Sequence, residues 1–205
     1  MHDRIDPRLR KLLARLPLAA GLAILLWFAL VGRPWSALVT RASEGWIRAA
    51  ERTKVTRLAF EDGMVVVQRA DLSSRSETPA FSAAPMTANL VLLLALLLAT
   101  PRDLRASAYA ARVAAAFAAL LLTQVLHLSF AVQTLYATQL GAWSVATWPR
   151  WQREVVATGR YFFDIVGKFA VPFVFWALTL RIGEDAEAET GNAASGKRRR
   201  SKGKG

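Results

Sequence analysis

Four long apolar stretches dominate the sequence and exclude an ordinary soluble fold. A bilayer core is crossed by about 20 apolar residues, with a range of about 17–25. One uncharged run, from Val113 to Trp148, is too long for a single span, so we place its membrane helix nearer its start. The predicted spans are Leu16–Gly32, Thr78–Pro101, about Ala110–Val132 and Tyr161–Leu180. The sequence therefore predicts an all-α membrane protein with four transmembrane helices.

Composition supports a membrane protein with basic flanks. Of the 205 residues, 54% are hydrophobic, yet the formal net charge is +12. Nucleic-acid binding is the usual alternative for so basic a chain, but the apolar runs argue against it. There is no cysteine, which excludes disulfides, zinc–thiolate sites and a cysteine nucleophile. His2 and His127 lie too far apart in the sequence to indicate a metal site by spacing, and no cofactor is expected.

The basic residues predict the orientation. They cluster in an N-terminal arm (1–15), a short link between the second and third spans (102–112), and a C-terminal tail (181–205). Four spans place all three segments on one side, which the positive-inside rule makes cytoplasmic. We therefore expect a multi-pass protein of the bacterial inner membrane with both termini cytoplasmic. Cleavage of the first span as a signal peptide is the less favoured alternative.

The C-terminal tail is predicted to be disordered. Residues 181–205 show no apolar periodicity and carry a run of positive charge. Lys197, Arg198, Arg199 and Arg200 are expected to bind anionic lipid headgroups, each contributing up to about 1 kcal/mol near the surface. Residues 16–180 then form the membrane domain.

The loop 33–77, placed outside, has recognisable structure of its own. In "PWSALVTRASEGWIRAAERT" apolar residues recur at helical spacing, which predicts an amphipathic helix on the outer surface. In "TRLAFEDGMVVVQRADL", Asp62-Gly63 separates two runs of β-forming residues, which predicts a small β-hairpin. These pieces either cover the helices as a cap or guide a substrate.

Polar residues inside the predicted spans form the candidate site. All are placed in the outer leaflet: Asn89, Gln124, His127, Asp164 and Lys168. Gln124 and His127 are one helical turn apart, as are Asp164 and Lys168. Such residues either hold helices together by hydrogen bonds or mark a reaction centre. We expect His127, Gln124 and Asn89 to face one another rather than lipid, because an unpaired polar group in hydrocarbon costs several kcal/mol.

The order of these parts resembles the core of the exosortase/archaeosortase family, which are integral-membrane transpeptidases that process C-terminal sorting signals of exported proteins. A first span, an outer helix and the hairpin "VTRLAFEDGMVVVQRADL" precede a small-residue junction, a long apolar helix and two further spans. The resemblance covers roughly Trp35–Leu180. It implies a role in protein sorting and in export associated with exopolysaccharide.

The catalytic motifs of that family are missing at their expected places. The family keeps a Cys at the junction, which here reads "SAAPMTANL", so Thr87 or Ser82 stands at a remnant nucleophile position. An Arg of the next helix is replaced within "TQVLHL", and a His of the last helix is replaced within "GRYFFDIVGKF" by Phe162 or Phe163. The resemblance is therefore to a degenerate, exosortase-associated membrane protein that lacks the catalytic Cys, Arg and His.

The first hypothesis is that the chain is a catalytically silent membrane protein. It would assist an exosortase or bind the C-terminal helix of the exosortase's substrates. A second hypothesis is a transpeptidase or protease in which Thr87 or Ser82 acts with His127. A third is an unrelated small transporter or assembly factor, for which Pro172 in "KFAVPFVFWA" is the one candidate helix break.

Overall fold

The computed structural model describes residues 7–51, 55–70, 79–100 and 106–179. The lipid-binding cluster expected at residues 197–200 lies outside the described residues, as do Arg102 and Arg105 of the basic link after the second span.

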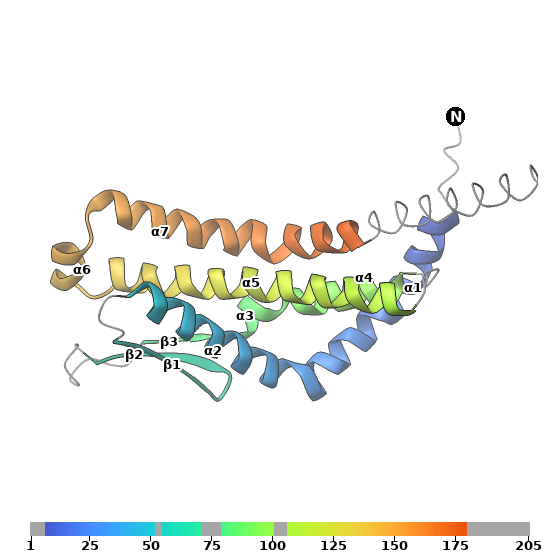
Figure 1. The fold of residues 1–205 in the computed structure, drawn as a ribbon, viewed down its shortest axis with the longest axis horizontal. Coiled ribbons are helices and arrows are strands. Elements are labelled where there is room, and N and C mark those ends of the chain that lie inside the picture. Colours follow the sequence, from blue (N-terminus) through green and yellow to red (C-terminus); the bar gives the residue numbers. More distant parts are fainter. Residues whose placement is uncertain (1–6, 52–54, 71–78, 101–105, 180–205) are drawn as a thin grey trace, which may run out of the picture.

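The first span and the outer helix form one continuous helix. It comprises α1 (Pro7–Leu26), the π-helical turn η1 (Trp27–Val31) and α2 (Gly32–Ala50), and it bends between α1 and α2 (Figure 1). The sequence predicted a span that ends at Gly32 and a separate outer helix after it, whereas the structure joins the two without a break. Pro34 has no N–H for the carbonyl four residues earlier, but the wider π turn just before it absorbs this irregularity without ending the helix.

The predicted hairpin is confirmed. Strands β1 (Thr56–Glu61) and β2 (Met64–Arg69) pair antiparallel. Asp62 and Gly63 both adopt positive φ, 47° and 80°, as a type I′ turn requires. A third strand that the sequence did not indicate, β3 (Ala80–Ser82), pairs with β2.

The second predicted span is shorter than expected. It comprises α3 (Ala84–Thr87) and α4 (Asn89–Ala99), and the whole apolar stretch Ala84–Ala99 measures about 24 Å at 1.5 Å per residue, against about 30 Å of hydrocarbon. Within the described residues, three helices are long and apolar enough to cross a membrane, namely Leu9–Ala50, Tyr109–Thr138 and Arg150–Thr179.

The last two long helices lie side by side. Helix α5 (Ala106–Thr138) extends beyond the predicted span at both ends. After α6 (Ala142–Thr147), helix α7 (Arg150–Phe162) begins before the predicted span and continues through η2 (Phe163–Gly167) into helical residues 168–179. Figure 1 shows α7 running along one side of α5, with α2 and the sheet on the other side.

Two apolar clusters account for most of the core. The first joins the sheet to α2 and α5 through Val39, Leu58, Val65, Val67 and Leu128. Leu58, Val65 and Val67 come from alternate strand positions, so one face of the sheet is buried. The second joins η1, α4 and α5 through Trp27, Leu90, Leu93, Leu97 and Leu120.

The buried face of α2 is more polar than its pattern indicated. Ser36, Thr40 and Ser43 are buried, whereas Leu38 and Trp46 are about half exposed. The Ser43 hydroxyl donates a 3.5 Å hydrogen bond to the Val125 carbonyl of α5. Small hydroxyl residues let helix backbones approach closely, which explains why α2 turns this face inward.

Candidate polar site within the helices

A chain of buried amides links four elements in the middle of the protein. The Trp35 indole Nε1 on α2 donates a 2.6 Å hydrogen bond to Gln124 Oε1 on α5. Gln124 Nε2 donates a 2.5 Å bond to Asn89 Oδ1 at the start of α4. Asn89 Nδ2 donates a longer bond, 3.5 Å, to the Gly167 carbonyl of η2. Gln124 and Asn89 are buried, so these bonds replace water that neither amide can reach.

A second group is built around Asp164. Its Oδ1 accepts a 2.8 Å hydrogen bond from Lys168 Nζ and lies 3.2 Å from His127 Nε2. Arg160 Nε lies 3.6 Å from the other carboxylate oxygen. The His127 side chain is only 4% exposed, whereas Asp164, Lys168 and Arg160 are between 25% and 37% exposed. One carboxylate therefore holds two cations and one imidazole at the surface of the bundle.

The two groups are connected because both take residues from α5 and from η2. Gln124 and His127 lie one turn apart on α5, and the π-helical turn η2 supplies both Asp164 and the Gly167 carbonyl. Phe163 of the same turn stacks on the His127 ring with 5.8 Å between centroids. In a π-helical turn the backbone hydrogen bond joins residues five apart, one more than in an α-helix. Such turns are frequent at functional sites.

The five predicted polar residues are thus distributed over two connected groups. Asn89 and Gln124 face each other, as the sequence indicated, and Asp164 pairs with Lys168 at the predicted i,i+4 spacing. His127 was expected to face Asn89 and Gln124, but it faces Asp164 instead, because Nε2 points toward η2.

Sequence reasoning missed three participants. Trp35 was assigned only to the apolar side of an outer helix, and nothing in the sequence connects it with Gln124. The Gly167 carbonyl is a backbone group, which no side-chain pattern indicates. Arg160 could have been found, since it lies four residues before Asp164 on the same helix.

The remnant nucleophile positions differ in their surroundings. Thr87 is 1% exposed, and its Oγ1 donates a 3.0 Å hydrogen bond to the Ala83 carbonyl and lies 3.3 Å from Ser36 Oγ. Ser82 is exposed on β3. Within the described residues, the hydrogen bond of the His127 ring goes to Asp164 and not to either hydroxyl. A general base must lie within hydrogen-bond reach of the hydroxyl that it activates.

The part of the chain that the structure describes contains no group of metal-ligating side chains. No three His, Asp or Glu side chains lie close enough together there to hold a metal ion. His127 and Asp164 are two potential ligands, and Lys168 and Arg160 already surround that carboxylate with positive charge.

Comparison with known proteins assigns the chain to a family. No curated protein and no solved structure matches the chain significantly. A family model, that of the exosortase H-associated membrane proteins, matches residues 6–182. This region contains every described element, including the hairpin, the buried amide chain and the Asp164 group. The chain belongs to the family of exosortase H-associated membrane proteins.

Proposed function

We propose that this protein is a non-catalytic partner of an exosortase in the bacterial inner membrane. It assists the processing or export of proteins that carry C-terminal sorting signals, by binding the exosortase or the C-terminal helix of its substrates. The observation that carries the proposal is the family match over residues 6–182. The absence of cysteine from the whole chain supports a role other than thiol catalysis.

The surroundings of Thr87 support the non-catalytic role. Its hydroxyl hydrogen is directed to the Ala83 carbonyl, and the side chain is buried beside Ser36. A nucleophile must reach both a base and the substrate carbonyl. His127, the basic side chain that the hypothesis of a threonine enzyme requires, is held by Asp164 and Phe163.

Two helices offer surfaces for a membrane partner. The helix Leu9–Ala50 exposes Leu18, Leu25 and Phe28, and the helix Arg150–Thr179 exposes Ile165 and Phe169. Apolar side chains on spanning helices contact either lipid or another helix. In the proposed complex, part of this surface packs against the helices of the exosortase.

Processing in cells tests this function. Loss of the whole protein should reduce processing of an exported protein with a sorting signal, as measured by its shift in size on immunoblots. Thr87→Val, which keeps the side-chain shape and removes the hydroxyl, and Ser82→Ala should both leave processing at the wild-type level. The contrary result would be cleavage of a sorting-signal peptide by the purified protein alone, abolished by His127→Ala. The protein would then be an enzyme.

A further inference from the structure

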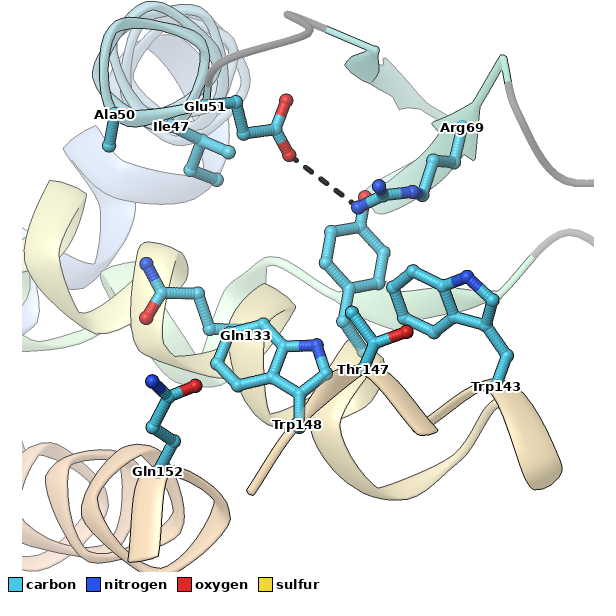
Figure 2. A pocket seen from close by; sticks show the side chains of 10 residues that line it. Ile47, Ala50, Glu51, Arg69, Gln133, Trp143, Thr147, Trp148 and Gln152 are labelled. Atoms are coloured by element: carbon cyan, nitrogen blue, oxygen red, sulfur yellow. Dashed lines mark ion pairs between the residues drawn. The ribbon is translucent and has the colours of Figure 1, made fainter. Parts of the chain in front are cut away.

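The two edges of the three-stranded sheet differ in how the described residues cover them. The outer edge of β1 lies against α2, and two carboxylates of that helix accept hydrogen bonds from it. Glu51 Oε2 accepts a 3.1 Å bond from the Thr56 N–H, and Glu44 Oε2 accepts a 3.4 Å bond from the Leu58 N–H. Glu51 also forms a 3.7 Å ion pair with Arg69 of β2, drawn in Figure 2, where both side chains line a pocket. Helix α2 therefore blocks this edge against a further strand.

The register of the sheet directs two residues of β3 away from β2. Hydrogen bonds to β2 are made by the Pro79 carbonyl and by the Ala83 N–H. In an antiparallel pair the bonded positions alternate along each strand, so Phe81 is the bonded residue between these two. The N–H and C=O groups of Ala80 and Ser82 therefore point to the outer edge.

This outer edge of β3 is open among the residues that the structure describes. Ala80 and Ser82 are exposed, and their backbone groups make no hydrogen bond to another described residue. Between them, Phe81 packs against the apolar cluster that joins the sheet to α2 and α5, which holds the strand in place. Charged side chains or proline within an edge strand oppose pairing, and Ala80–Ser82 contains neither.

We propose that this edge binds, as an added β-strand, the extended segment that precedes the C-terminal membrane helix of an exported substrate. Ala80 and Ser82 each offer one donor and one acceptor, and they lie about 7 Å apart at about 3.4 Å per residue. An extended backbone presents its own donors and acceptors at the same repeat, whatever its side chains are. A sugar or a lipid headgroup has no such repeat, so the edge selects polypeptide.

The place of β3 in the chain favours a substrate over other polypeptides. Strand β3 leads directly into α3 and then into the apolar helix α4. A segment that lies parallel to β3 would likewise pass from the sheet toward the level at which the apolar helices begin. An exported protein with a C-terminal helix has the same order of parts. This choice of occupant rests on the proposed function.

Peptide binding to the full-length protein in nanodiscs tests the proposal. The probe is a fluorescein-labelled peptide that copies the outer segment directly before the C-terminal helix of an exported protein from the same organism. Fluorescence polarisation measures its affinity. Two further versions carry N-methyl groups on alternate peptide nitrogens, one on the odd and one on the even residues. The version methylated on the side that faces β3 should lose binding, and the other should bind like the unmodified peptide.

Two variants at one position separate the backbone of β3 from its side chains. Ser82→Pro removes the outward N–H and keeps the bonds to β2, so it should weaken binding about fivefold, as expected for one lost hydrogen bond. Ser82→Ala removes only the hydroxyl and should bind like the wild type. Equal unfolding midpoints show that both variants keep the fold. If Ser82→Pro unfolds, the two methylated peptides still test the proposal on the wild-type protein.

The cysteine-free chain allows the site to be mapped by disulfide formation. Ser82 and Glu61 lie at the same level on opposite edges of the sheet, because both pair with Met64. A probe peptide with one cysteine should crosslink to Ser82→Cys and not to Glu61→Cys. Alternate positions of the cysteine in the peptide should react best, since successive side chains of a strand point to opposite faces.

Four results would overturn the inference: no binding of the unmodified peptide, the same affinity for both methylated peptides, the same affinity of folded Ser82→Pro and Ser82→Ala, or equal crosslinking at Ser82 and Glu61. Crosslinking of Ser82→Cys to a second copy of the chain, undiminished by the peptide, would assign the edge to a dimer and also contradict the proposal. None of these results would affect the proposed association with an exosortase, since the assays contain no exosortase.

Discussion

Gln124 hydrogen-bonds Asn89 across 2.5 Å while accepting the indole proton of Trp35, so one amide on α5 ties together α2 and α4. These three residues come from parts of the chain that are far apart in sequence, and both Gln124 and Asn89 are buried. In the interior of a membrane protein such a bridge fixes the relative rotation of helices that apolar packing alone leaves free to slide.

Removing this bridge should destabilise the protein. Gln124→Leu keeps the volume but leaves the Trp35 N–H and the Asn89 carbonyl unpaired, which should cost about 1–2 kcal/mol of unfolding free energy. Thermal unfolding in detergent measures the change. Gln139→Leu, at an exposed glutamine near the end of the same helix, should change the midpoint little. An equal loss in both variants would show that the amide chain has no special role.

The Asp164 group should depend on its single carboxylate. Asp164→Asn removes the negative charge that offsets part of the charge of Lys168 and Arg160, so it should lower the unfolding midpoint clearly. Adding Lys168→Met to Asp164→Asn should recover part of the loss, because the unpaired cation is removed as well. Glu154→Gln, which breaks an exposed i,i+4 pair with Arg150, is the control and should have little effect. No recovery in the double variant would contradict this account.

Close packing of α5 on α7 depends on Gly159. A Cβ at this position would lie 2.5 Å from Cε1 of Phe130, closer than real contacts allow. Gly159→Ala should therefore push the helices apart and lower stability by about 1–3 kcal/mol. Gly45→Ala is the matched control, since open space surrounds Gly45 on α2 and alanine favours the helix by up to about 1 kcal/mol. The same unfolding assay should separate the two glycines, and a neutral Gly159→Ala would contradict the packing.

Short-range patterns predicted the parts of this structure that depend on neighbours in sequence. Asp62-Gly63 predicted the hairpin because few other residue pairs adopt two positive φ angles. Asp164 and Lys168 predicted an ion pair because i,i+4 side chains on a helix meet. The long apolar runs predicted three of the helices, since only helices satisfy so many backbone groups in a membrane.

Features that depend on how helices pack could not be predicted in this way. His127 and Asp164 lie 37 residues apart, and only the packing of α5 against η2 brings them together. Strand β3 has three residues, too few for an alternating pattern to be visible. The continuous helix through Gly32 and Pro34 rests on a π-helical turn, which no residue pattern identified in advance.

Membrane topology remains a prediction of the basic flanks. With both termini cytoplasmic, reporter fusions at Glu61 in the hairpin and after Gly205 should give signals from opposite sides of the membrane. This outcome requires that the apolar helix Ala84–Ala99 spans together with the three longer helices. A signal from the same side at both positions would rule out the four-span arrangement.

Association with an exosortase is the central claim, and co-purification tests it most directly. This protein and an exosortase from the same organism, each with a different affinity tag, are co-expressed, extracted in mild detergent and purified through the tag on this chain. The account predicts that the exosortase co-elutes in near-equal amount and still does so with Thr87→Val, because binding does not require the remnant nucleophile position. Elution of this chain alone, with the exosortase folded and present in the extract, would contradict it.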